Sequence, residues 1–264
     1  MKKITTIIRK EWAEIFKNRM VLFTVAFLPL ILTAIPIGIL IGMRSEATGM
    51  ANITADMPDQ FNMFCPADLN AGDCFQVYLV SQFMLMFMLL PLSIPATIAA
   101  YSIVGEKTTR SLEPLLATPI TTVELLIGKS LSAVIPAVLA TYAAFGIFAV
   151  SAFFLIPNRT LLAAILDARW LIAVVVLGPL LALMAVNFSI MVSSRVNDPR
   201  VAEQISIVVI IPLMAVFLGQ LGGLFVINRQ LVIASVVVVF LCDLLLTYLA
   251  VRLFERENIL TRWK

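Results

Sequence analysis

Residues 75–104 read FQVYLVSQFMLMFMLLPLSIPATIAAYSIV, thirty residues in a row without a single charge. A helix needs roughly 20 apolar residues to cross the ~30 Å hydrocarbon core of a bilayer. Because 61% of all residues are hydrophobic, no soluble core could enclose them. Five more stretches are long and apolar, the last of them with one acid, Asp243: residues 21–43, 130–158, 170–194, 204–228 and 230–251. The sequence therefore predicts a membrane protein with six spans.

The expected fold class is an all-α membrane protein. Lipid offers the backbone no hydrogen-bond partners, so only helices and closed barrels cross it, and barrel strands would alternate between apolar and polar residues. These stretches do not alternate. We expect one domain over residues 1–264, with an interfacial helix at 1–20, an outer loop at 44–74 and a cytoplasmic loop at 105–125.

The basic residues predict the orientation. If both termini are cytoplasmic, fifteen of the nineteen Lys and Arg residues lie on the inner side, and only Arg44, Arg159, Arg169 and Arg229 lie outside. Such an excess is typical of cytoplasmic loops. The net charge of +3 is therefore interpreted as a topological signal and not as a nucleic-acid surface.

The segment before the first span has the pattern of an amphipathic helix. Apolar residues recur at helical spacing, while most basic residues lie off that stripe. Such a helix lies in the plane of the membrane interface, with its aromatic residue at headgroup depth. The stripe consists of Ile4, Ile7, Ile8, Trp12, Ile15 and Phe16.

The sequence of the loop 105–125 predicts a short helix with an apolar face for binding another protein. Thr109 or Ser111 can cap it, and Leu112, Leu115 and Leu116 then share one face. An apolar face exposed to the cytosol marks an interaction surface. A second helix is expected to start at Thr121 or Thr122 and to lead into the third span.

This loop resembles a known family. Gly105-Glu106-Lys107, Ser111-Leu112-Glu113-Pro114-Leu115-Leu116, Thr118-Pro119-Ile120 and Glu124-Leu125-Leu126-Ile127-Gly128-Lys129 are similar to the loop of type-2 ABC exporter permeases. Residues 193–200, SSRVNDPR, and 257–264, ENILTRWK, extend the resemblance. Within the family, the sodium-efflux and multidrug type of permease is the most similar.

The resemblance implies a transmembrane exporter subunit that forms a dimer, or pairs with a related permease, in a prokaryotic inner or plasma membrane. It implies a coupling helix that docks on a separate ATPase, which would bind the ATP and Mg; this chain itself is expected to bind no cofactor. The implied ATPase-binding residues are Glu106, Arg110, Leu112, Glu113, Leu115, Leu116 and Thr118. Because the second and fifth spans usually meet at the dimer axis of this family, the implied translocation path includes Gln82, Thr97, Gln204 and Gln220.

Catalysis by this chain is not expected. It contains no histidine, which excludes histidine-based metalloprotease sites and triads. Gly128-Lys129-Ser130 imitates the end of a phosphate-binding loop, but that motif requires glycine at Val123. A stand-alone ion-coupled transporter is the alternative, because ionisable groups within spans often serve as proton or cation sites. Asp243 would be that group, and it joins Gln82, Thr97, Gln204 and Gln220 as a candidate residue of the translocation path. The competing interpretation pairs it with Tyr101, a serine or a backbone group.

Two cysteines lie in the predicted outer loop. Cys65 and Cys74 are on the side where an oxidising compartment permits a disulfide. A bond between them is therefore a hypothesis for this loop.

Overall fold

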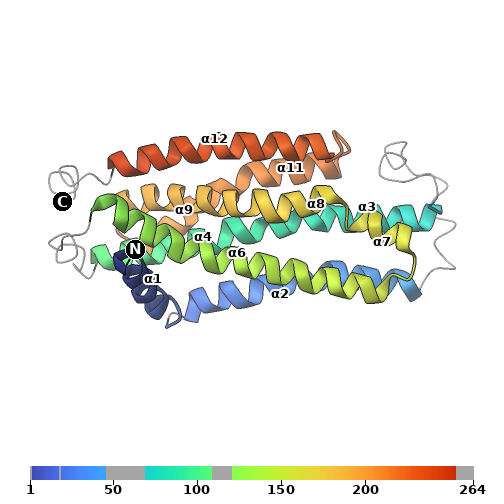
Figure 1. Cartoon of the computed structure of the whole chain (residues 1–264), viewed down its shortest axis with the longest axis horizontal. Helices are drawn as coiled ribbons and strands as arrows, with labels where there is room; N and C mark the ends of the chain where they lie inside the picture. The colour runs from blue at the N-terminus through green and yellow to red at the C-terminus, as the bar shows by residue number, and fades with distance from the viewer. Residues whose placement is uncertain (1, 18, 46–68, 109–120, 254–264) are drawn as a thin grey trace.

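The computed structural model describes residues 2–17, 19–45, 69–108 and 121–253, and these residues form helices and short connections without any strand (Figure 1). The helices run side by side along the long axis, except α1, which lies across one end of the bundle. We call this end the α1 end. The helical elements are α1 (Lys2–Ile15), α2 (Arg19–Ser45), α3 (Ala71–Met86), η4 (Phe87–Leu89), α4 (Leu90–Thr108), α6 (Thr122–Leu155), α7 (Arg159–Ile165), α8 (Ala168–Ile172), η5 (Ala173–Leu177), α9 (Gly178–Arg195), α10 (Pro199–Ser206), η6 (Ile207–Ile210), α11 (Ile211–Leu221) and α12 (Arg229–Leu253).

Six helical segments are long and apolar enough to cross a membrane, which confirms the predicted fold class. Their boundaries differ from the predicted ones at several ends. The apolar stretch of the third span starts at residue 130, and α6 begins at Thr122, where the capping pattern predicted a helix that leads into this span. The fifth was expected to end at residue 228, yet α11 ends at Leu221. The observed spans are residues 21–43, 72–106, 123–155, 159–195, 199–221 and 229–253.

Local hydrogen bonds explain these two boundaries. At the start of α6, the Thr121 hydroxyl accepts a bond from the Glu124 N–H, and the Glu124 carboxylate accepts one from the Thr121 N–H. This reciprocal arrangement satisfies two N–H groups that a helix start leaves free. At the end of α11, the chain turns at Gly223, whose φ of 69° is in the left-handed region that favours glycine.

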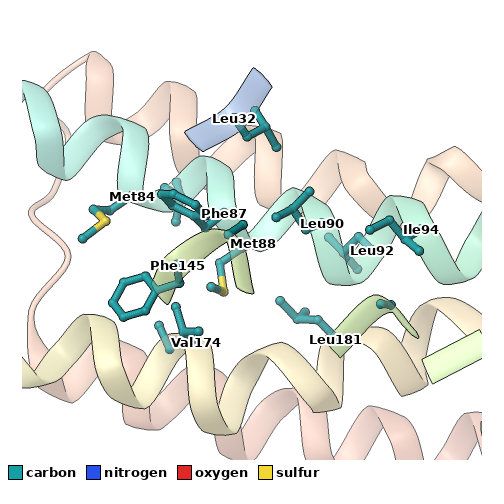
Figure 2. Packing of buried hydrophobic residues seen from close by; sticks show 14 of the residues in the cluster. Leu32, Met84, Phe87, Met88, Leu90, Leu92, Ile94, Phe145, Val174 and Leu181 are labelled. Atoms are coloured by element: carbon teal, nitrogen blue, oxygen red, sulfur yellow. The ribbon is translucent and has the colours of Figure 1, made fainter. Parts of the chain in front are cut away.

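The second span, formed by α3, η4 and α4, is at the centre of the bundle. It is the most buried of the six spans, and α4 makes its most extensive contacts with α9 and then with α6. Phe87 lies in this centre, with its ring centroid 6.1 Å from that of Phe145 and 5.8 Å from that of Phe148. Figure 2 shows Met84, Phe87 and Met88 converging with Phe145 of α6. By contrast, α10, α11 and α12 expose most of their apolar side chains, as expected of helices that face lipid.

Three spans depart from α-helical geometry just before a proline. The short elements η4, η5 and η6 precede Pro91, Pro179 and Pro212, respectively. Proline has no N–H, so the carbonyl four residues earlier loses its α-helical partner. At η5, the hydroxyl of Tyr142 in α6 donates to the carbonyl of Val175 at 2.9 Å, which replaces the missing bond.

Candidate functional site

Helix α1 packs on α6 through its apolar face. Ile7 and Ile15 are buried as predicted, whereas Phe16 is exposed. Gly128 of α6 permits the close approach, because a Cβ atom at this position would lie 2.8 Å from Cγ2 of Ile7. A side chain larger than hydrogen at position 128 would therefore push α1 away from α6.

Trp12 stabilises the contact between α1 and α6 next to a proline of α6. The indole N–H of Trp12 donates to the carbonyl of Ser132 at 3.0 Å. In a regular helix that carbonyl would accept from the residue four positions on, which is Pro136 and has no N–H. Trp12 thus satisfies a carbonyl that α6 cannot satisfy itself. An unsatisfied buried carbonyl is costly, so this bond stabilises the docked position of α1.

Three charged side chains, one each from α1, α4 and α6, meet where these helices contact each other. The Lys129 ammonium lies 3.0 Å from Oε1 of Glu11 and 2.7 Å from Oε2 of Glu106. The side chains of Lys129 and Glu11 are only 4% and 2% exposed. Ser102 of α4 completes the arrangement: its hydroxyl donates to Oε2 of Glu11 at 2.5 Å and accepts from Lys129 at 2.8 Å. We call Glu11, Ser102, Glu106 and Lys129 the ion cluster.

Lys10 adds a second positive charge at the edge of the cluster. Its ammonium donates to Oε1 of Glu106 at 2.6 Å and lies 3.7 Å from Glu14. Partial burial lowers the pKa of Lys10, but the hydrogen bond to Glu106 and the charges of Glu106, Glu11 and Glu14 outweigh that effect. The pKa of Lys10 is therefore raised above its usual value. The two buried carboxylates are thus balanced by two ammonium groups, as buried charges require.

The ion cluster joins both helices that flank the 109–120 loop. Glu106 is in the last turn of α4, which ends at Thr108, and Lys129 is in the second turn of α6, which begins at Thr122. Glu11 comes from α1. One ammonium therefore ties the helix before the loop, the helix after it and the interfacial helix together.

Most of the predicted partner-binding residues lie outside the described part of the chain: Arg110, Leu112, Glu113, Leu115, Leu116 and Thr118. Glu106, the remaining member, is described, buried and ion-paired within the chain. Glu106 was predicted to contact the ATPase, whereas in the structure its carboxylate contacts Lys10 and Lys129 of the same chain.

The structure brings Glu11 and Lys129 into the site, although the sequence analysis assigned a role to neither. Glu11 is four residues from both Ile7 and Ile15, which places it in the middle of the apolar stripe. That position was the available signal, because a charge on a buried helical face requires a partner. Nothing in the sequence identified that partner, since Lys129 is 118 positions away.

The predicted path residues are on five different helical elements, and none of them hydrogen-bonds to another among the described residues. Thr97 of α4 donates to Oε1 of Glu203 in α10 at 2.7 Å. Gln82 of α3 and Gln220 of α11 are buried and have no hydrogen-bond partner in the part of the chain that the structure describes, whereas Gln204 of α10 is exposed. Buried, unbonded amides are rare in folded proteins, so these two glutamines stay candidates for a polar path.

Asp243 of α12 is 3% exposed, and within the described residues neither carboxyl oxygen has a hydrogen-bond partner. The interpretation that paired it with Tyr101, a serine or a backbone group is therefore wrong for this structure. Its neighbour one turn on, Thr247, accepts a bond from Asn187 of α9 at 2.9 Å.

The absence of a partner predicts the stability effect of replacing Asp243. Burying an unbonded polar group costs on the order of 1–3 kcal/mol, so we expect Asp243→Leu to keep or raise the melting temperature of the purified protein. Asn187→Leu, which breaks the bond to Thr247, is the matched control and should lower it. A lower melting temperature for Asp243→Leu than for Asn187→Leu would show that Asp243 has a structural partner.

Cys74 is disulfide-bonded, whereas Cys242 is a free, exposed cysteine. The predicted partner of Cys74, Cys65, lies outside the described residues. The bond between Cys65 and Cys74 stays a prediction.

Comparison with known protein families identifies the family of this chain. The family described as ABC-2 family transporter protein matches residues 5–236, from the start of α1 into α12. The chain belongs to the ABC-2 transporter family. No match was found among curated proteins. As a family member with six apolar helices, the chain is a multi-pass permease of an ABC transporter. The 109–120 loop and the ion cluster both lie within the region that matches the ABC-2 family.

Proposed function

We propose that this ABC-2 permease is the transmembrane subunit of an ATP-driven exporter, and that the loop between α4 and α6 docks on a separate ATPase. The observation that carries the proposal is the ion cluster. It joins the last turn of α4 to the second turn of α6 at both ends of the loop. A force applied to the loop would therefore reach two spans at once, including the central one.

The remaining features of the proposal rest on membership of the ABC-2 family and on the resemblance to its exporter permeases. Two permease copies, or this chain with a related one, would form the path, and the ATPase subunits would bind the ATP and Mg. Both termini would face the cytoplasm of a prokaryotic cell, because the basic residues gather at the α1 end. The resemblance to sodium-efflux and multidrug permeases favours a cation or a drug as the exported substrate.

Replacing Leu116 by aspartate tests the docking. We expect Leu116→Asp to abolish co-purification of the ATPase, because the charge would enter the apolar face that Leu112, Leu115 and Leu116 are predicted to share. The measurement is the amount of ATPase recovered with the affinity-tagged permease from membranes that contain both chains.

Thr109→Asp is the matched control for this substitution. It adds the same charge to the same loop, and aspartate caps a helix as well as threonine does, so ATPase recovery should match the wild type. Undiminished recovery with Leu116→Asp would contradict the assignment of the loop.

Asp243 favours a second candidate function, a stand-alone ion-coupled transporter. A buried carboxyl group without a partner in the last span is a typical cation or proton site. This alternative requires that the chain alone, reconstituted in vesicles without any ATPase, dissipates a proton or sodium gradient. It also requires that Asp243→Asn abolishes the flux. The exporter proposal expects no such flux from the chain alone.

A further inference from the structure

We infer that Lys129 is the positioning residue that makes α1, the end of α4 and the start of α6 one mechanical unit, so that α1 moves with the loop on which the ATPase acts. The part of this inference that concerns ATPase action rests on the function proposed above. The unit itself is argued from the structure alone.

The first step is the contact between α1 and α6. Ile7 packs against Gly128, Glu11 pairs with Lys129, and Trp12 bonds to the Ser132 carbonyl. These three contacts follow each other along both helices. They hold one face of α1 against a short stretch of α6 directly after the loop, so α1 cannot slide along α6 without breaking all three.

The second step is the connection to α4. Helix α1 makes few direct backbone contacts with α4 but many with α6. The link between α1 and α4 is therefore carried by side chains: Ser102 bonds to Glu11, and Glu106 binds Lys10 and Lys129. Only Lys129 contacts groups from both other helices while its own backbone belongs to α6. Removing its ammonium would break the ion pairs that hold α6 to Glu11 of α1 and to Glu106 of α4.

A buried ion cluster holds its helices in one relative position. Burying charges is expensive, and a well-packed apolar replacement of a buried ion pair is often as stable. The benefit of such a pair lies in its geometry, because a displaced partner leaves an uncompensated charge in a low-dielectric surrounding. A cluster of this kind resists small relative movements of its helices, whereas an apolar contact tolerates them. That property suits a unit that must transmit movement.

Hydrogen exchange of the full chain in lipid nanodiscs tests the unit. We expect Lys129→Met to speed amide exchange in peptides from residues 2–17 and 121–130 by roughly tenfold or more, because Glu11 loses its closest cation and Glu106 keeps only Lys10. Peptides from α9 and α12 should exchange as in the wild type. If Lys129→Met fails to fold, Glu11→Gln replaces it, since glutamine keeps the size and the bond to Ser102 but loses the charge.

Lys3→Met is the matched control. Lys3 also pairs with a carboxylate of α6, Glu124, at 3.7 Å, but that pair is exposed and exposed pairs contribute little. Exchange in α1 should therefore stay within about twofold of the wild type. Unchanged exchange in α1 of the Lys129→Met or Glu11→Gln variant would overturn the inference.

A second arm uses the complex with the ATPase, trapped by ATP and vanadate. A unit that transmits movement predicts that trapping changes exchange in α1 together with the end of α4 and the start of α6, and that Lys129→Met uncouples α1 from the other two. A cluster that only adds stability predicts no change in α1 of the wild type, and that result would overturn the inference. Failure of any ATPase to co-purify would contradict the proposed function, while the nanodisc experiment would still decide whether the unit exists.

Discussion

Gly128→Ala should lower the melting temperature of the purified protein. The new Cβ would lie 2.8 Å from Cγ2 and 3.0 Å from Cβ of Ile7, distances that require α1 to move away from α6. Overpacking of this kind costs about 1–3 kcal/mol. Displacement of α1 would also lengthen the Trp12–Ser132 and Glu11–Lys129 contacts, so we expect the upper part of this range. The measurement is thermal unfolding followed by intrinsic tryptophan fluorescence.

Two further variants show whether the lower melting temperature comes from the clash between the added Cβ and Ile7. Gly146→Ala changes a glycine of the same helix that has nothing within 4 Å of the added Cβ; it should be neutral or stabilise by up to about 1 kcal/mol, because alanine favours helices. Ile7→Ala combined with Gly128→Ala should recover part of the loss, since alanine lacks the Cγ2 and Cδ1 atoms that would lie 2.8 and 3.2 Å from the added Cβ. No difference between Gly128→Ala and Gly146→Ala would rule out the close packing of α1.

Glu106→Ala should have the largest effect on stability of any single substitution proposed here. It removes the shared carboxylate of Lys129 and Lys10, at 2.7 and 2.6 Å, and leaves the ammonium of Lys129 buried with one carboxylate. Breaking a buried ion pair by removing one partner costs about 3–5 kcal/mol. We expect the variant to insert in the membrane but to unfold at a clearly lower temperature or detergent concentration.

Glu14→Ala is the control for this substitution. Glu14 also pairs with Lys10, at 3.7 Å, but its side chain is exposed, so the change should stay within about 0.5 kcal/mol. Equal losses for Glu106→Ala and Glu14→Ala would mean that burial of the cluster does not matter. Glu106→Gln should fall between the two, because its amide oxygen can still accept from one lysine, whereas its NH2 group cannot accept from the other and the charge is lost.

Features that depend on neighbouring residues were predictable from the sequence. The apolar length of residues 75–104 indicated a span without reference to any other segment, since the bilayer sets the required length. The start of α6 at Thr121 or Thr122 was predicted from a capping pattern within four residues, and the structure confirms it. The amphipathic pattern of α1 likewise predicted its apolar face, of which Ile7 and Ile15 are buried and Phe16 is exposed.

Features that depend on contacts between distant segments were not predictable. Glu106 was assigned to a partner surface because the loop around it resembles one, yet its carboxylate is buried against Lys10 and Lys129. Likewise, one of the two interpretations of Asp243 paired it with a neighbouring group, but the packing of α12 leaves both of its oxygens unbonded among the described residues. Burial and ion pairing are properties of how helices cross, which one segment's composition does not contain.

The sequence by itself determined that this chain is a helical membrane protein, how many spans it has and where several of them begin and end. Those properties follow from apolar length, proline positions and local hydrogen bonds, which act within a few residues. Only the tertiary structure decided that α1 rests on Gly128 and that Glu11, Glu106 and Lys129 form one buried cluster. The physical reason is that an ion pair forms wherever folding brings opposite charges within about 4 Å, however far apart they are along the chain.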